Sequence, residues 1–298
     1  MVGEFFHMSV SIIGCGWLGK ALALRLLASN VKVIASYQSQ QSLAKLNALN
    51  IPATQLILPI IDDVMCCHRL EAITGVDIAL FQQEVLIIAI PPQLKKGRKD
   101  YPLKIQQLVR LAELGKIKHI ILLNSTAIYN GLEGAVNEAS KLDGNAEKVA
   151  SLLAAEHAVQ GFSKHVNILR LAGLVGPNRH PGKFLQANRV FENASATVNL
   201  VHQTDVVNII EKLIQLNSAD CKQSIYNVVS NTDCQRRTYY QTAAQALGLA
   251  VPQFAIEHQH HAGKKIIGAT LRRELAYDYI YDDLLSWLKD GDAMLDNF

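Results

Sequence analysis

The sequence predicts an α/β fold built on a doubly wound parallel sheet, with a smaller C-terminal lobe. Two observations indicate this. A glycine-rich turn at 14–19 joins an apolar strand at 10–13 to a helical run at 20–29, and a second strand follows at 31–34. Two later apolar runs, at 84–90 and 119–123, have the composition of central parallel strands that are covered on both faces.

Composition narrows the class of protein. The 298 residues are 49% hydrophobic and 18% charged, which is typical of a globular protein with a substantial core. The net charge of +3 is too small to indicate nucleic acid as the main partner, and no apolar run has the length of a membrane span. Residues 1–7 lack the features of a signal peptide, and the five cysteines form neither a metal spacing nor an even disulfide set. We therefore expect a cytoplasmic protein without a membrane or nucleic-acid partner.

Each glycine of the turn has its own task. Gly14 lets the chain leave the strand, Gly16 lets the backbone approach a pyrophosphate, and Gly19 lets the helix pack on the strand. The positive end of the helix dipole and the first amides of the helix would face the phosphates. A structural turn without a ligand and a methyl-donor enzyme are the alternatives. The predicted cofactor-binding residues are Gly14, Cys15, Gly16, Trp17, Leu18 and Gly19.

The end of the second strand bears on cofactor preference. An enzyme that selects NAD places Asp or Glu about twenty residues beyond the first glycine, on the ribose 2′-hydroxyl. This chain has residues 35–38 there, without an acid, and Ser36 could donate a hydrogen bond to a 2′-phosphate. No Arg follows, so the preference for NADP over NAD is slight, and an ordinary loop is the alternative interpretation.

The carboxyl ends of the later strands belong to the same predicted site, because ligands bind at that edge of such sheets. Ala89 and Pro91 end the run at 84–90 and complete the predicted cofactor site. Ser125 and Thr126 follow the run at 119–123, where a hydroxyl can hydrogen-bond a substrate carbonyl or alcohol. Capping of a turn by these hydroxyls is the alternative.

Four segments carry a resemblance to a known superfamily. They are Ser125–Asn130 (STAIYN), Ile168–Gly182 (ILRLAGLVGPNRHPG), Val198–Val206 (VNLVHQTDV) and Tyr226–Val229 (YNVV). They resemble the extended and atypical short-chain dehydrogenases of the NAD-dependent epimerase/dehydratase superfamily, whose strand closes with Ser-Ser/Thr-x-x-Val-Tyr-Gly. The closest likeness is to the YeeZ-like branch, from residue 8 to about residue 288. It implies a Rossmann fold that binds NAD(P).

Redox members of that superfamily use Ser or Thr, a Tyr, and a Lys four residues after the Tyr. The Ser carries over to Ser125, and the family signature on the helix that should hold the pair ends in a Glu, which is matched to Glu156. Counting back from Glu156 places Leu152 at the Lys position and Lys148 at the Tyr position, so the pair is absent. A lysine normally lowers the pKa of the tyrosine, so acid–base work must come from elsewhere. The candidates are Tyr129, Lys148, His180 and His202, and Ser125 and Tyr129 are the predicted catalytic residues.

The loop 173–182 is predicted to lead into the smaller lobe through a helix at 183–192. Arg179, His180 and His202 are predicted substrate contacts together with Thr126, although solvated or capping roles would explain the same residues. Asp205 is expected to be structural, near the start of a helix at 206–216. His258, His260 and His261 have no acidic or cysteine partner at ligand spacing, so no metal is expected.

These predictions combine into a three-part chain: an extension at 1–7, an NAD(P)-binding Rossmann domain at 8–172, and a mixed segment at 173–298 that returns to the core and forms the substrate-facing lobe. The main hypothesis is an oxidoreductase or epimerase acting on a small polar, sugar-like substrate. The alternative is a non-catalytic NAD(P) sensor that has lost the Tyr-x-x-x-Lys pair. The resemblance also suggests a homodimer.

Overall fold

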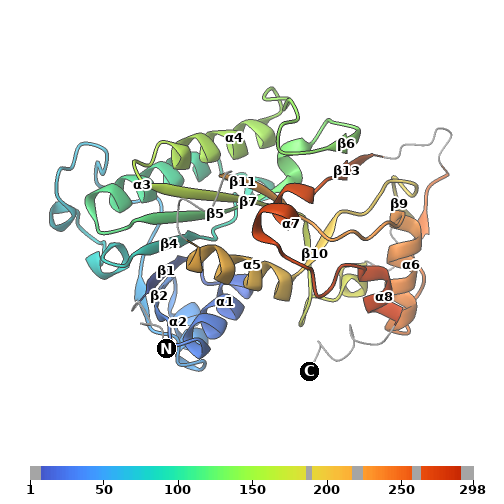
Figure 1. Cartoon of the computed structure of the whole chain (residues 1–298), viewed down its shortest axis with the longest axis horizontal. Coiled ribbons are helices and arrows are strands. Elements are labelled where there is room, and N and C mark those ends of the chain that lie inside the picture. Colours follow the sequence, from blue (N-terminus) through green and yellow to red (C-terminus); the bar gives the residue numbers. More distant parts are fainter. Residues whose placement is uncertain (1–7, 186–189, 217–223, 257–262, 290–298) are drawn as a thin grey trace. The chain divides into compact units, whose positions relative to one another are not determined.

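The structure is a computed structural model that describes residues 8–185, 190–216, 224–256 and 263–289. Seven of the strands in these ranges form a parallel sheet in the order β11-β7-β5-β4-β1-β2-β3, which confirms the predicted doubly wound α/β fold (Figure 1). The strands of this sheet are β1 (Ser9–Ile13), β2 (Lys32–Tyr37), β3 (Ala53–Gln55), β4 (Val85–Ile88), β5 (His119–Ser125), β7 (His165–Leu171) and β11 (Ile225–Val228).

Helices alternate with these strands along the chain. In Figure 1, α3 and α4 run side by side along one side of the sheet, and α1 lies on the other side. None of the helices in the described ranges is long and apolar enough to cross a membrane. The α-helices are α1 (Trp17–Ala28), α2 (Gln40–Asn47), α3 (Tyr101–Leu114), α4 (Glu147–Gln160), α5 (Gln203–Gln215), α6 (Arg236–Ala246), α7 (Ala269–Leu275) and α8 (Leu284–Lys289).

The strand order reverses beside β1, which pairs in parallel with β2 on one side and with β4 on the other. The side chains of β4 are buried along the whole strand, as its apolar run predicts. Such a reversal leaves a crevice at the carboxyl ends of the two central strands, and ligands of doubly wound sheets bind there. The ends of β1 and β4 are therefore the first place to look for a cofactor site.

The chain divides into two compact units. Unit 1 comprises Met1–Asn124, Gly144–Leu169 and Leu213–Ser224, and unit 2 comprises Ser125–Asp143, Arg170–Lys212 and Ile225–Phe298. The chain thus passes from unit 1 to unit 2 three times, after Asn124, after Leu169 and after Ser224. The three-part division itself stays a prediction.

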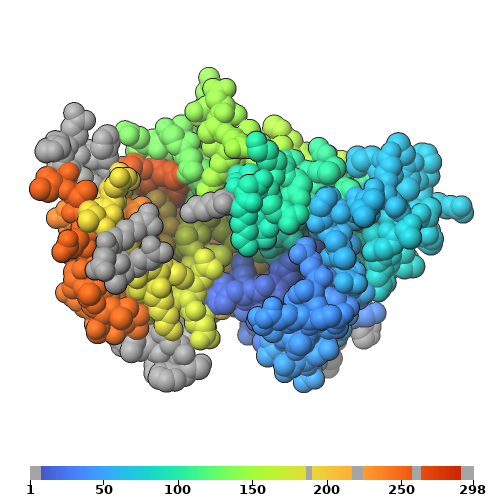
Figure 2. Space-filling model, turned by 180° about the vertical axis from the view of Figure 1, so that it is seen from behind, coloured from blue at the N-terminus to red at the C-terminus, as the bar shows by residue number. Residues whose placement is uncertain are grey.

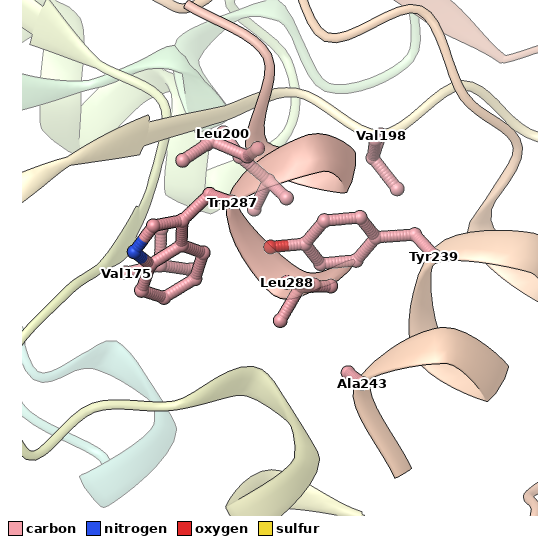
Figure 3. Close-up of a cluster of buried hydrophobic side chains, with 8 residues drawn as sticks. Val175, Val198, Leu200, Tyr239, Ala243, Trp287 and Leu288 are labelled. Carbon is pink, nitrogen blue, oxygen red and sulfur yellow. The ribbon is translucent and has the colours of Figure 1, made fainter. Parts of the chain in front are cut away.

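Unit 2 is assembled from short elements and a compact core. Besides β11 and the end of β7, its strands form three two-stranded parallel pairs: β8 (Gly173–Val175) with β10 (Leu200–His202), β9 (Val190–Phe191) with β12 (Gln253–Phe254), and β6 (Gly134–Val136) with β13 (Lys264–Ile266). Figure 3 shows Tyr239 of α6 and Trp287 and Leu288 of α8 packed with Val175 and Leu200 in one hydrophobic cluster.

A buried carboxylate at the start of α5 binds the segment 277–281 of unit 2 by hydrogen bonds. Asp205, in the first turn of α5, is fully buried and accepts hydrogen bonds from the Tyr277 hydroxyl (2.8 Å) and from the backbone N–H groups of Ile280 (2.7 Å) and Tyr281 (3.1 Å). Its predicted structural role is confirmed, and its partners come from more than seventy residues downstream.

The predicted helix at 183–192 is wrong at the described residues of that range, and residues 186–189 lie outside them. Pro181–Phe184 form a 3₁₀ turn, η5, with His180 as its N-cap, and Val190–Phe191 form the strand β9. The reason is long-range pairing: β9 joins β12, and the rings of Phe191 and Phe254 lie 5.8 Å apart. A helical pattern cannot reveal a partner strand sixty residues away.

The segment between β3 and β4 had no clear sequence pattern. It contains two 3₁₀ turns, η1 (Leu70–Ala72) and η2 (Ile78–Phe81), whose apolar residues Leu70, Leu80 and Phe81 are buried. Much of the segment lies on the surface of unit 1, in light blue to cyan (Figure 2). A further short turn, η3 (Leu94–Lys96), follows β4.

Candidate functional site: the glycine turn and the Ser125 turn

The glycine turn of unit 1 has a geometry that only glycine provides. Gly14 follows β1 with φ +95°, and a Cβ there would lie 2.8 Å from the carbonyl carbon of Ala89. A Cβ at Gly19 would lie 2.9 Å from the Gly14 oxygen, so this glycine permits the close packing of α1 on the turn. Gly16 differs, because it is exposed and the nearest atom to an added Cβ, outside its chain neighbours, is 4.0 Å away.

The start of α1 presents backbone amides beside Gly16. Gly16 is the N-cap, no side-chain hydrogen bond caps the helix in the described part of the chain, and the Lys20 N–H makes a helical bond to the Gly16 oxygen (2.9 Å). The amides of Leu18 and Gly19 therefore precede that helical bond at the positive end of the helix dipole. This is the arrangement that binds a pyrophosphate in dinucleotide-binding folds.

The neighbouring strand ends complete the site in unit 1. The Ala89 N–H donates to the Ile13 oxygen (2.8 Å), which joins the end of β4 to the end of β1, and Pro91 follows at an exposed position. Burial raises the pKa of the Cys15 thiol to about 12, against the opposing charge of Lys20, so Cys15 stays a neutral thiol near pH 7. The structure thus brings the predicted cofactor residues of 14–19, Ala89 and Pro91 to one edge of unit 1.

Ser36 has a second task that the sequence does not reveal. Its hydroxyl oxygen accepts a hydrogen bond from the Gly14 N–H (3.2 Å), and the residue is 7% exposed. Ser36 therefore fixes the glycine turn from the end of β2. Its predicted bond to a 2′-phosphate would use the hydroxyl proton, because the oxygen already serves Gly14.

Ser125 and Thr126 begin a rigid turn in unit 2. The Ser125 Oγ accepts a hydrogen bond from the Ala127 N–H (3.1 Å) and caps η4 (Thr126–Tyr129). The Thr126 hydroxyl is buried and donates to the Leu171 oxygen (3.3 Å), so it supports the turn. Ser125 is half-buried, whereas Thr126 and Tyr129 of the same turn are buried.

Tyr129 is held inside unit 2. Its ring is fully buried, its hydroxyl donates to the Asn227 Oδ1 (2.8 Å), and the Arg170 Nη1 donates to that hydroxyl (2.7 Å). Burial raises the pKa of the phenol even though the Arg170 charge opposes the shift. A buried phenol that stays protonated is poorly suited to act as a base, and its contacts also fit a structural role, so the catalytic role of Tyr129 stays a prediction.

Lys148 and Leu152 of α4 occupy the positions at which the resemblance places the Tyr and the Lys of the family. Lys148 is exposed, and Leu152 is fully buried. The Asn124 side-chain amide, near the end of β5, donates to the Glu156 Oε1 (2.7 Å) and to the Leu152 backbone oxygen (3.4 Å). These contacts place Leu152 beside the end of β5, so an apolar side chain occupies that position.

Arg179, His180 and His202 lie in unit 2 with their side chains engaged. The Arg179 Nε donates to the Leu174 oxygen (3.0 Å), and its guanidinium lies 5.5 Å from the centre of the Phe184 ring. The buried His180 accepts from the Gly182 N–H (3.1 Å), and burial with the nearby charge of Lys183 lowers its pKa to about 4.

His202 serves as a second buried cap. Its Nδ1 accepts from the Thr204 N–H (3.2 Å), and its ring lies 3.9 Å from that of Tyr281 and 5.2 Å from that of Trp287. The two histidines therefore fit the capping interpretation, and their roles as substrate contacts stay predictions. The described residues contain no group of three or more metal-ligating side chains, and His258, His260 and His261 lie outside the described residues.

Lys264 is the residue of this region that the sequence did not indicate. Its Nζ donates to the Thr126 backbone oxygen (3.2 Å) and to the Asn130 Oδ1 (2.7 Å), at the turn that Ser125 opens. No motif contains Lys264, and 138 residues separate it from Thr126. Only the pairing of β13 with β6 brings it there.

Comparison with known proteins agrees with this geometry. Residues 8–161 match the family model described as UDP-glucose/GDP-mannose dehydrogenase family, NAD binding domain. Protein YeeZ of Escherichia coli (strain K12) is 33% identical over 281 residues, which cover 93% of this chain and 97% of YeeZ.

Solved structures share the fold at lower identity. A candidate NAD-dependent epimerase/dehydratase from Methylobacillus flagellatus is 22% identical with a TM-score of 0.74, over 97% of this chain and 99% of that one. UDP-glucuronic acid 4-epimerase from Bacillus cereus, in complex with UDP-glucuronic acid and NAD, is 15% identical with a TM-score of 0.71, over 95% and 97%. The predicted likeness to the YeeZ-like branch is confirmed. The chain belongs to the family of YeeZ, and its residues 8–161 belong to the UDP-glucose/GDP-mannose dehydrogenase family, NAD binding domain.

Proposed function

We propose that the chain binds NAD(P) with its pyrophosphate on the glycine turn of unit 1. The observation that carries this proposal is the contrast among the three glycines. Gly14 and Gly19 are closely packed against backbone, whereas Gly16 is exposed beside the first amides of α1 and leaves the space that a phosphate requires. Membership of residues 8–161 in a family named for NAD binding supports it.

The preference between the two cofactors follows from the end of β2. Neither an acid that would hold a 2′-hydroxyl nor an arginine that would hold a 2′-phosphate stands at residues 35–38. We expect both cofactors to bind, with NADPH slightly tighter, because nothing in Ala35–Gln38 repels the extra phosphate.

We further propose that the protein is an oxidoreductase or epimerase of the short-chain dehydrogenase type, acting on a small polar, sugar-like substrate. Ser125 is the residue proposed to orient the substrate, since it is half-buried and its oxygen is fixed by the Ala127 N–H. The complexes of MoeE5 with UDP-glucose and NAD and of the Bacillus cereus epimerase with UDP-glucuronic acid and NAD support nucleotide sugars as the first substrates to try. Arg179 stays the predicted contact on the substrate loop.

Isothermal titration with NADH and NADPH tests the cofactor proposal. Saturable binding of either one supports it, and Gly16→Ala should weaken that binding. Competition by S-adenosylmethionine would indicate a methyl-donor enzyme instead. If neither dinucleotide binds, the proposed function is wrong.

Turnover is tested next with UDP-glucose and UDP-glucuronic acid in the presence of the cofactor that binds. Substitution Ser125→Ala should abolish turnover if Ser125 orients the substrate. The matched control is Ser140→Ala, another half-buried serine of unit 2, whose Oγ likewise accepts a backbone N–H, that of Asn137 (2.9 Å). It should leave turnover unchanged.

A non-catalytic dinucleotide sensor is the second candidate. Two observations favour it: Leu152 is buried where the family has Lys, and the phenol of Tyr129 is locked between Arg170 and Asn227. Cofactor binding without turnover across alcohols, ketones and nucleotide sugars would support the sensor, and measured turnover would exclude it. For either function we expect a cytoplasmic protein that forms a homodimer.

A further inference from the structure

One peptide group joins Lys264 to Ser125. The Lys264 Nζ donates to the carbonyl oxygen of Thr126 (3.2 Å). The N–H of that same peptide group belongs to Ala127, and it donates to the Ser125 Oγ (3.1 Å). An ammonium, one amide and a hydroxyl thus form a continuous hydrogen-bonded chain within unit 2.

The fold holds Lys264 in this place by several contacts. β13 pairs in parallel with β6, with Lys264 opposite Gly134, and the Gly134 N–H donates to the Gly263 oxygen (2.9 Å). The Asn130 Oδ1 accepts a second bond from the Lys264 Nζ (2.7 Å), and the lysine is half-buried. Its backbone oxygen accepts from the Asn199 side-chain amide (2.9 Å).

The turn at the other end of the chain of bonds is equally fixed. The Thr126 hydroxyl is bonded to the Leu171 oxygen, and the Tyr129 hydroxyl is bonded to Arg170 and Asn227. The Thr126–Ala127 peptide group therefore cannot turn away from Lys264 without breaking these contacts. A charge placed on its oxygen acts on an amide of fixed direction.

The electrostatic consequence falls on Ser125. A cation on a carbonyl oxygen draws electron density from the amide nitrogen, so the N–H becomes a stronger donor, and chains of hydrogen bonds polarise one another in this way. The stronger Ala127 N–H donor fixes one lone pair of the Ser125 Oγ, and the O–H of Ser125 stays available to donate to another group. The O–H is then a better donor toward a substrate oxygen, and no proton is transferred in the process.

We propose that Lys264 is a positioning residue that acts through the Thr126–Ala127 peptide group to direct and strengthen the hydrogen bond that Ser125 donates to substrate. The catalytic part of this inference rests on the proposed function of Ser125, while the polarised peptide group does not.

Nuclear magnetic resonance of the full chain with bound NADPH or without it tests the relay without any substrate. The readout is the amide ¹⁵N and ¹H shift of Ala127 in the wild type, Lys264→Met and Lys264→Arg. Loss of the bond to the Thr126 oxygen should move the Ala127 resonance upfield in Lys264→Met, and Lys264→Arg should restore most of the wild-type position because it keeps the charge.

The matched control is Lys265→Met. Lys265 is the next residue, is exposed, and pairs with Asp233 (3.1 Å) instead of the turn. It should leave the Ala127 resonance in place, and thermal melts should show that all three variants are folded. An Ala127 resonance that does not move in folded Lys264→Met overturns the proposal.

The second readout needs a turned-over substrate from the nucleotide-sugar panel. Lys264→Met should lower kcat by roughly two- to tenfold with little change in KM, because polarisation alters the strength of one hydrogen bond by a fraction only. Lys264→Arg should recover most of kcat, and an unchanged kcat in Lys264→Met overturns the catalytic part. If no substrate is turned over at all, the proposed catalysis fails, and the Ala127 shift still decides whether the relay exists.

Discussion

Substitution Gly16→Ala separates phosphate binding from folding. Gly16 has φ −80° and ψ −146°, which lies outside the α and β regions that residues with a Cβ prefer, while the nearest atom to an added methyl group is 4.0 Å away. Gly16 is also the N-cap of α1, where Ala is poorer than Gly, so we expect the free energy of unfolding to fall by about 1–3 kcal/mol. The methyl group would occupy the space that the pyrophosphate needs.

The loss of affinity can be bounded. A hydrogen bond to a charged phosphate contributes about 1.5–3 kcal/mol, so displacement of one phosphate oxygen from an amide should weaken NAD(P) binding roughly 10- to 150-fold. Isothermal titration measures the Kd, and urea unfolding measures the stability of the same sample.

Substitution Gly14→Ala is the control, because it should mainly lower the free energy of unfolding, whereas Gly16→Ala should mainly lower the affinity for NAD(P). It combines φ +95° with a contact of 2.8 Å to the Ala89 backbone, so it should cost about 2–5 kcal/mol of stability. If folded Gly16→Ala binds NAD(P) with the wild-type Kd, the phosphates do not lie on this turn and the reasoning is refuted.

Three further predictions concern groups inside the two units. Tyr129→Phe leaves the buried Arg170 without one acceptor, so the free energy of unfolding should fall by about 1–3 kcal/mol. The Kd for NAD(P) should stay unchanged, and a higher Kd would contradict a purely structural role for Tyr129. Burial, with the nearby His165, lowers the pKa of His119 to about 3, so the unfolded chain binds a proton below pH 6.5 that the folded chain does not. The free energy of unfolding should therefore fall as pH drops from 6.5 toward 3, by about 1.4 kcal/mol per pH unit more in the wild type than in His119→Gln. Urea unfolding at pH 7 and pH 5 measures this fall, and an equal fall in the two proteins would contradict the prediction. Iodoacetamide at pH 8 should modify the exposed Cys66 well before Cys15, whose pKa of about 12 leaves roughly one thiol in ten thousand ionised, and mass spectrometry shows which of the two reacts first.

The local parts of the fold could be predicted from the sequence. The turn at Gly14–Gly19 and the strand β4 are set by glycine conformation and by a run of apolar residues, and both signals lie within a few neighbouring residues. The same holds for β5, which contains the apolar run at 119–123. Interactions between residues close in sequence determine these elements.

What the sequence could not show depends on partners far along the chain. The strand β9 replaces a predicted helix because β12 pairs with it, and Tyr129 is buried because Arg170 and Asn227 meet it from other strands. Lys264 reaches Thr126 across 138 residues, so no spacing rule contains it. A motif identifies Ser125, but the surroundings of its hydroxyl are decided by tertiary structure.

The buried carboxylate of Asp205 depends on hydrogen-bond donors that are synthesised near the end of the chain. Its oxygens are satisfied by amides and a phenol from residues 277–281, which leave the ribosome more than seventy residues after Asp205 itself. Until that stretch emerges, the start of α5 would carry a negative charge that must stay in water, since enclosing it without donors is costly. We expect a chain cut short before residue 277 to leave this carboxylate without these three donors.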